Sequence, residues 1–106
     1  MPYMIFTQDV EQGAEIRKQH LDAHLAYLEG RVEILIASGG LLNEEPRAIG
    51  AVILINVDTR EEAEDFVHND PFYKAGLFKT LVIQRWRQFY LHGRPDRGPF
   101  APLAPH

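Results

Sequence analysis

Residues 48–62 read AIGAVILINVDTREE, and this stretch predicts a strand followed directly by a helix. Ala48–Val57 is almost wholly apolar and rich in β-branched residues, which is typical of a buried strand. Thr59 and Glu62 then have the spacing of a capping box, in which both side chains bind backbone amides at the start of a helix. We expect this helix to end at residues 69–71, because the proline at position 71 disfavours helical geometry in the residue before it.

The rest of the chain predicts a second, longer helix and three further strands. A stripe of apolar residues spaced three and four apart indicates a helix from about Ala14 to Ser38, and Gly39-Gly40 is expected to end it. The stripe consists of Leu21, Leu25, Leu28, Val32 and Leu35. The other expected strands cover residues 3–7, 41–43 and 78–91, with a polar turn at 44–47 and a short turn or helix at 71–77.

This order, β-α-β-β-α-β, predicts an α+β protein of the ferredoxin-like class. In that arrangement a four-stranded antiparallel sheet carries both helices on one face. Residues 52–55 and 4–6 are apolar at successive positions, so both faces of these strands are apolar. The face without helices must therefore be covered, and a second copy of the chain is the simplest cover, which predicts a homodimer.

Composition excludes several classes of partner and chemistry. The chain of 106 residues has a formal charge of −4, which argues against a nucleic-acid partner. It contains no cysteine, so disulfides, thiolate zinc sites and cysteine nucleophiles are ruled out. The longest apolar stretch, residues 51–55, is too short to span a bilayer, and the first residues lack the basic start of a signal peptide. We therefore expect a cytoplasmic protein with no membrane partner.

The C-terminal segment differs from the rest of the chain. Residues 93–106 contain four of the seven prolines, which removes backbone amide donors that a helix or a central strand needs. We expect one domain over residues 1–92 and an extended Pro-rich tail over 93–106. Phe100 and Leu103 are the apolar side chains through which this tail would contact a neighbouring surface.

Histidines and one aspartate are the candidates for chemistry. His20 and His24 are four residues apart and share a helix face, so they could chelate a metal together with a third ligand. Leu21 stands where the zinc motif H-E-x-x-H has its glutamate, so a solvated histidine is the simpler interpretation. Asp70, before Pro71, is either a helix-terminating residue or a site carboxylate. Arg17 is either a solvated helix residue or an anion anchor at a pocket mouth. Ser38 lacks the sequence of a nucleophile elbow, and no glycine-rich nucleotide motif is present.

Taken together, these segments resemble the YCII-related (YciI-like) family over about residues 1–91. The resemblance rests on Arg17, His24-Leu25, Tyr27-Leu28, Ala37-Ser38-Gly39-Gly40, Asp70-Pro71-Phe72 and Ala75-Gly76-Leu77. It implies a dimeric α+β barrel in which two sheets pack face to face. It also implies a pocket with His24 and Asp70 as an acid–base pair, in contact with each other, and with Arg17, Ser38 and Gly39 nearby.

Two functions are compatible with this pattern. The first is a cofactor-independent enzyme of lyase, isomerase or dehydrochlorinase type, acting on an unknown small molecule, with Phe72 among the aromatic residues of the pocket wall. The second is a non-catalytic dimer that binds a small ligand or a partner protein, with His24 and Asp70 in a structural role. The lack of a nucleotide motif and of cysteine argues against NAD or thiol chemistry, while haem and flavin stay open.

Overall fold

The computed structural model describes residues 2–98 of the chain. Six strands and three helices follow one another in this segment. They are β1 (Tyr3–Asp9), α1 (Gly13–Glu29), β2 (Leu35–Leu42), β3 (Ala48–Ile55), α2 (Arg60–His68), α3 (Pro71–Lys74), β4 (Phe78–Arg85), β5 (Tyr90–Leu91) and β6 (Arg94–Pro95). Within these residues, none of the helices is both long and apolar enough to cross a lipid bilayer.

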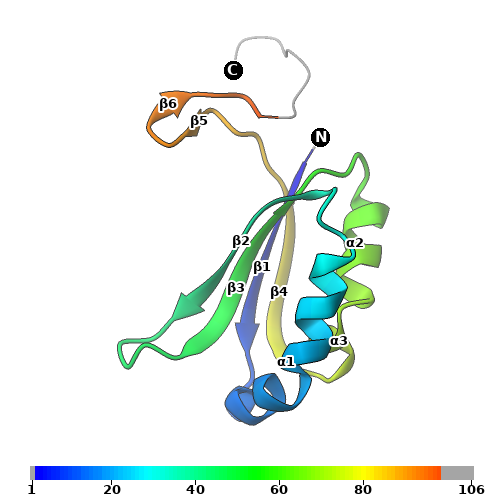
Figure 1. The fold of residues 1–106 in the computed structure, drawn as a ribbon, viewed down its shortest axis with the longest axis vertical. Helices are drawn as coiled ribbons and strands as arrows, with labels where there is room; N and C mark the ends of the chain where they lie inside the picture. The colour runs from blue at the N-terminus through cyan, green and yellow to red at the C-terminus, as the bar shows by residue number, and fades with distance from the viewer. Residues whose placement is uncertain (1, 99–106) are drawn as a thin grey trace.

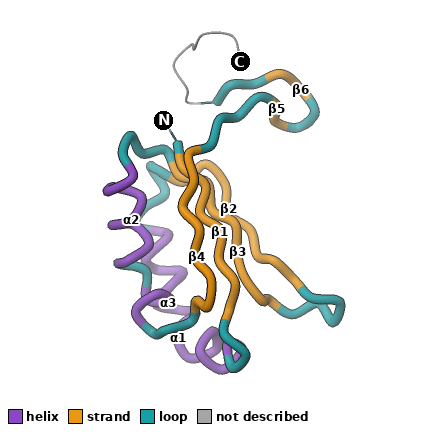
Figure 2. Tube along the Cα trace, turned by 180° about the vertical axis from the view of Figure 1, so that it is seen from behind, coloured by secondary structure: helices purple, strands orange, loops and turns teal. Residues whose placement is uncertain are grey.

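Four of the strands form an antiparallel sheet in the order β2-β3-β1-β4, and the helices cover one of its faces (Figures 1 and 2). The central strand β1 pairs with β3 on one side and β4 on the other, so Ile5 lies opposite both Ile53 and Ile83. This is the ferredoxin-like arrangement, and the predicted fold class is confirmed.

The residues at the start of α2 and α3 explain where these helices begin. The Thr59 hydroxyl accepts a hydrogen bond from the Glu62 amide, and the Glu62 carboxylate accepts one from the Thr59 amide, so the predicted capping box is present. Two residues after α2 ends, Asp70 caps α3 by accepting a hydrogen bond from the Phe72 amide, with Pro71 at the first helical position. Because both helix N-termini are capped and only Asn69 and Asp70 separate α2 from α3, the position of Asp70 in the helical layer is fixed.

The main core lies between the sheet and the helices. Its largest fully buried apolar side chains come from β1, β3, α2 and the segment after α3: Ile5, Ile55, Phe66 and Leu77. Tyr27 and Leu28 of α1 pack against this core. The side of α1 that faces the sheet therefore carries an aromatic residue as well as aliphatic ones.

The predicted long helix is wrong in its second half. The helix α1 ends at Glu29, with Gly30 at its C-cap, and residues 35–42 form the edge strand β2. Ser38, Gly39 and Gly40 therefore lie within a strand and do not follow a helix. Three of the five residues of the stripe that suggested a longer helix are exposed: Leu21, Leu25 and Val32 expose 43%, 51% and 56% of their surface, whereas Leu28 and Leu35 pack against the core.

The C-terminal part also differs from the prediction. The strand β4 stops at Arg85, and residues 90–95 form a separate two-stranded hairpin, where an extended tail was expected from residue 93. This hairpin spans the expected domain boundary at residue 92. Phe100 and Leu103 lie outside the described residues.

Among residues 2–98, no helix covers the second face of the sheet. The side chains that alternate with the core residues on the central strands point to this side, which we call the open face: Met4, Phe6, Val52, Leu54 and Val82. None of them is buried, and Val82 exposes 40% of its surface. The two-sided apolarity read from the sequence is thus a property of the folded sheet.

Candidate active site

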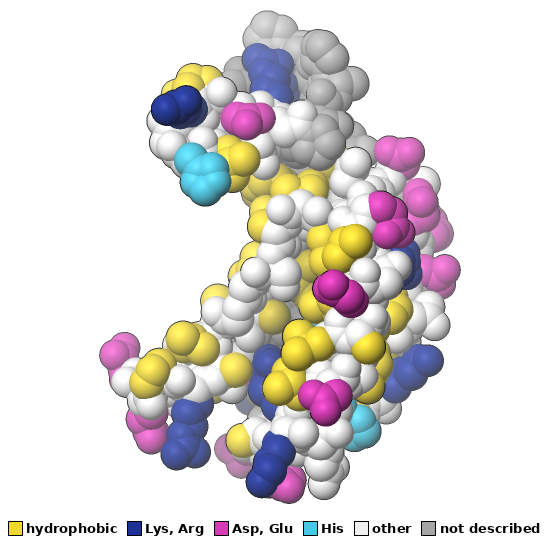
Figure 3. Space-filling view, in the orientation of Figure 1, with side chains coloured by type: hydrophobic (Ala, Val, Ile, Leu, Met, Phe, Trp, Pro, Cys, Tyr) yellow, Lys and Arg dark blue, Asp and Glu magenta, His cyan; other side chains and the backbone are white. Residues whose placement is uncertain are grey.

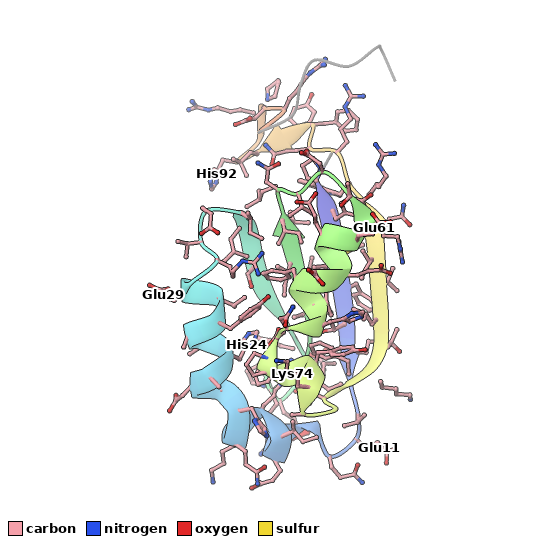
Figure 4. All side chains as sticks on the ribbon, turned by 90° about the vertical axis from the view of Figure 1, so that its right-hand side faces the viewer. Glu11, His24, Glu29, Glu61, Lys74 and His92 are labelled. Carbon is pink, nitrogen blue, oxygen red and sulfur yellow. The ribbon has the colours of Figure 1, made fainter. Side chains whose placement is uncertain are left out.

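The expected contact between His24 and Asp70 is present. His24 Nδ1 and Asp70 Oδ1 are 2.8 Å apart, although the two residues are 46 positions apart in the sequence. Their side chains expose only 13% and 3% of their surface. His24 projects from α1 toward α3, and Figure 4 places it between α1 and the α2–α3 side of the helical layer.

Asp70 has two reasons to occupy this position. Its Oδ1 atom accepts the hydrogen bond of the Phe72 amide, which fixes the side chain at the start of α3, and the same atom contacts His24. A buried carboxylate needs such partners, because leaving it unpaired in a low-dielectric interior is costly. With the carboxylate as acceptor, His24 donates from Nδ1, which leaves Nε2 as the nitrogen able to exchange a proton.

Phe72 connects the histidine to the arginine of α1. Its ring stacks on the His24 imidazole, with centroids 4.0 Å apart and planes inclined by 12°. The Arg17 guanidinium lies over the same Phe72 ring, 5.2 Å from its centroid. Arg17 and His24 are two helical turns apart on α1, so one buried aromatic ring touches both. The structure therefore brings Arg17, His24, Asp70 and Phe72 into one cluster.

Arg17 is held by the end of the central strand. Its Nε and Nη2 atoms donate to the two carboxylate oxygens of Asp9, at 2.6 and 3.1 Å, and Nη2 also donates to the Gly50 carbonyl at 3.3 Å. Asp9 is nearly buried, with 5% of its side chain exposed, whereas Arg17 exposes 18%. This bidentate pair gives the guanidinium a fixed plane beside Phe72.

A second polar group lies one turn further along α1. The Tyr27 hydroxyl donates to the Phe66 carbonyl at 2.8 Å and accepts a hydrogen bond from Arg31 at 3.1 Å. Burial raises the pKa of Tyr27 above its ordinary value, and the negative charge of Asp70 acts in the same direction, while Arg31 acts against it. Tyr27 thus stays neutral well into the alkaline range and ties α1 to α2.

Ser38 and Gly39 are not in contact with this cluster through any hydrogen bond or ring contact between described residues. Both are exposed on the edge strand β2. Ser38 pairs with Ile53 and so lies on the helix-covered side of the sheet, whereas Gly39 pairs with Val52 on the open face. A Cβ atom at Gly39 would meet nothing within 4 Å, so its small size is not required by packing within the described part of one chain.

Sequence reasoning missed three residues of this region. Asp9 lies two residues after the end of the first predicted strand, and an acidic residue eight positions before Arg17 was the available signal. Gly50 interrupts an apolar strand, and such a glycine often marks close backbone approach; a side chain there would collide with the Thr7 backbone. Thr7 is buried on β1, and its hydroxyl has no hydrogen-bond partner among residues 2–98.

A cavity of about 370 Å³ adjoins the Arg17–Asp9 pair. It lies between the start of α1 and the turn that joins β2 to β3, and its lining includes Asp9, Gly13, Asn43, Arg47 and Ile49. A cavity of this size can hold a small ligand. In the part of the chain that the structure describes, no group of three His, Asp or Glu side chains is placed to hold a metal ion.

Comparisons with known proteins identify a family, and the similar proteins include one of known sequence and one of known structure. The family model of the YCII-related domain matches residues 1–87. An uncharacterized protein of Haemophilus influenzae is 25% identical over 99 residues, which cover 85% of this chain and all of that protein. A solved structure of 5-chloro-2-hydroxyhydroquinone dehydrochlorinase (TftG) from Burkholderia phenoliruptrix, in complex with 2,5-dihydroxybenzoquinone, is 30% identical. It superposes with a TM-score of 0.75 over 82% of this chain and 94% of that one.

Proposed function

The chain belongs to the YCII-related domain family, and we propose that it is a cofactor-independent small-molecule enzyme in which His24 and Asp70 are the acid–base pair. The observation that carries this proposal is the 2.8 Å contact between His24 Nδ1 and Asp70 Oδ1, with both side chains largely withdrawn from water. A histidine oriented by a carboxylate is a competent proton acceptor near neutral pH.

In the proposed reaction His24 Nε2 takes a proton from an acidic O–H or C–H group of the substrate. The electron pair of that bond moves into the substrate, and a leaving group departs with the electron pair of its own bond. Asp70 holds the ring by its Nδ1–H and stabilises the imidazolium that forms. The proton is then released to solvent, so the step is an elimination that needs no external oxidant or reductant.

The substrate class follows from the neighbour and from the residues around His24. TftG is by name a dehydrochlorinase of a hydroxylated aromatic ring and was captured with a quinone. We propose that this chain also acts on a small hydroxylated ring compound that carries a leaving group. Such a substrate ionises to an anion, for which we propose Arg17 Nη1 as the donor, since Nε and Nη2 bind Asp9 and Gly50. Phe72 is only 3% exposed and supports the His24 ring, and it is proposed as an apolar contact at the edge of the substrate. Ser38 and Gly39 remain predicted substrate contacts.

The proposed enzyme is a homodimer that pairs through the open face. Met4, Phe6, Val52, Leu54 and Val82 form the apolar surface that a second sheet would cover, in line with the dimeric barrel expected from the resemblance. A monomer would leave this face in water.

Single-residue variants test the catalytic assignment. Release of chloride from chlorinated hydroxyhydroquinones is measured for the wild type and for His24→Asn and Asp70→Asn, with thermal unfolding recorded for each. General acid–base catalysis predicts a loss of about 10²- to 10⁴-fold in both variants. His20→Asn is the matched control, because His20 lies on the same helix outside the Asp70 contact. Wild-type turnover in His24→Asn would exclude the assignment.

One observation favours the non-catalytic alternative. Asp70 Oδ1 serves both His24 and the cap of α3, so the pair also joins α1 to α3. If this is its whole role, Asp70→Asn and His24→Asn lower the melting temperature but leave ligand affinity unchanged. Calorimetric titration with 2,5-dihydroxybenzoquinone, together with the absence of turnover in the wild type, distinguishes this binding protein from the enzyme.

A further inference from the structure

The segment after β4 forms a defined arm that leaves the domain. We use this name for residues 86–98, which contain the β5–β6 hairpin and lie almost wholly outside the family match at 1–87. Gln88, only 2% exposed, donates to the Asp96 carbonyl, and the Asp96 amide donates to the Phe89 carbonyl. The arm is therefore internally bonded, and Figure 1 shows it projecting to the side of the sheet away from the helices.

The outer surface of the arm is apolar and basic. Tyr90 and Leu91 expose 66% and 46% of their surface. Arg94 and Arg97 are also exposed. A hollow of about 560 Å³ lies among Phe89, Tyr90, Pro95, Asp96 and Arg97. Exposed aromatic and arginine side chains around a hollow are typical of a protein–protein contact.

The opposite end of the sheet carries a second projection with complementary properties. The turn that joins β2 to β3 covers residues 43–47, and Asn43 Oδ1 orders it by accepting hydrogen bonds from the Glu45 and Arg47 amides. Glu44 and Glu45 are exposed at its tip. Leu42 and Ile49 flank the turn and expose 59% and 47% of their surface.

Figure 3 shows the two projections as the ends of a crescent that opens on the side of the sheet without helices. The arm presents exposed Arg94 and Arg97 against one exposed carboxylate, Asp96, and the turn presents exposed Glu44 and Glu45 against one exposed guanidinium, Arg47, so these exposed residues give the two ends opposite net charges. Two copies that face each other through their open faces can meet in two ways. If like ends met, arginines would oppose arginines and glutamates would oppose glutamates, whereas unlike ends pair opposite charges at both ends.

We infer that two copies pair head to tail, each inserting the turn of residues 43–47 against the arm of the other. The inference rests on the dimer in the proposed function and adds its orientation and the residues that fix it. A two-fold axis across the strands generates two identical arm–turn contacts. In each contact Glu44 and Glu45 face the partner copy's arginines at positions 94 and 97, and Leu42 meets the hollow of the arm.

Cysteine cross-linking of the full chain tests this orientation without background, because the sequence has no cysteine. Glu45→Cys and Arg94→Cys are made as separate variants, mixed, allowed to exchange subunits and treated with a short bismaleimide. The linker avoids the strict geometry of a disulfide, which needs Cα atoms within about 7 Å. We expect a cross-linked dimer in the mixture and little in either variant alone. Lys18→Cys replaces Glu45→Cys as the control, since Lys18 is exposed on the helical side.

Efficient cross-linking of Arg94→Cys with itself would overturn the inference in favour of a like-ends dimer. No cross-link, with light scattering still showing a dimer, would overturn the arm–turn contact and leave the open-face dimer standing. A monomer by light scattering would contradict both the dimer and its orientation. The chloride-release assay of the His24 variant would still test the catalytic assignment independently.

Charge reversal gives an independent measure. The double variant Arg94→Glu/Arg97→Glu places like charges together in the head-to-tail dimer and should raise the dimer dissociation constant roughly three- to tenfold. Adding Glu44→Arg and Glu45→Arg to the same chain restores opposite charges and should recover the wild-type constant. In a like-ends dimer the double variant would change nothing, which would contradict the inference.

Discussion

The two faces of the sheet are built from alternate residues of the same strands, yet only one face is covered. On the helical side Ile5, Ile53 and Ile83 are buried at 1%, 4% and 7% exposure. Their neighbours on the open face, such as Leu54 and Val82, are equally apolar but remain partly exposed. The difference shows that a strand with apolar residues at successive positions belongs to a sheet whose two faces both need cover. The chain's own helices cover one of these faces.

The covered face also holds all the buried charge described at the candidate site. The Arg17–Asp9 and His24–Asp70 pairs lie between α1 and the neighbouring elements, where helix ends and strand ends supply backbone partners. The open face carries no such group at its centre. The two faces therefore differ in role: one fixes the fold and the candidate site, and the other is suited to association.

A matched pair of substitutions should separate these roles, and their effect on folding and association is expected to be large. Ile53→Asp places a carboxylate in the core, which costs several kcal/mol, comparable with the whole stability of such a domain, so the chain should not fold. Leu54→Asp, one position away, should fold as a monomer because its side chain lies on the open face. Circular dichroism reports folding and light scattering reports mass. A Leu54→Asp protein that remains a dimer would contradict the difference between the faces.

The sequence allowed this two-sided sheet to be predicted, but not the end of α1. Leu21, Leu25 and Val32 have helical spacing, yet they are exposed, so the spacing reflects neither burial nor the length of the helix. Gly30 was the local signal for the end, and it was outweighed by the apolar stripe. The side chains that α1 turns toward the interior include Arg17, His24 and Tyr27, which no hydrophobic pattern can reveal.

The candidate site was predictable only in part for a similar reason. The contact between His24 and Asp70 followed from the family resemblance together with two helices on one face. The Asp9–Arg17 pair depends on the exact place where β1 ends and α1 begins, which single-sequence reasoning does not fix. The position of Ser38 was mispredicted because Gly39-Gly40 suggests a helix end as readily as a strand edge.

A smaller effect on stability is expected at Tyr27, whose hydroxyl joins α1 to α2. Tyr27→Phe leaves the Phe66 carbonyl without this donor and should lower the free energy of unfolding by about 2 kcal/mol at neutral pH. The raised pKa of Tyr27 also adds a pH dependence. Above its ordinary value of 10.0 the unfolded chain loses this proton while the folded protein keeps it, so stability falls as pH rises through that range.

Urea unfolding from neutral pH to about pH 11 measures this dependence, since the ordinary tyrosine value lies within that range. The wild type should lose more stability than Tyr27→Phe over the alkaline part. Tyr90→Phe is the control, because Tyr90 is 66% exposed on the arm. Parallel curves for the wild type and Tyr27→Phe would show that folding does not raise the pKa of Tyr27.

The smallest effect concerns the cap of α2, which lies in the covering layer and does not touch the open face. Thr59→Ala removes the hydroxyl that accepts from the Glu62 amide and should lower the free energy of unfolding by about 1 kcal/mol. Thr59→Ser keeps a hydroxyl and should retain most of that stability. Because the cap belongs to the covering layer alone, both variants should keep the wild-type mass in light scattering. A change in mass for Thr59→Ala with no change for Thr59→Ser would show that the covered face and the open face are coupled through the sheet. The two faces could then not be treated as separate surfaces.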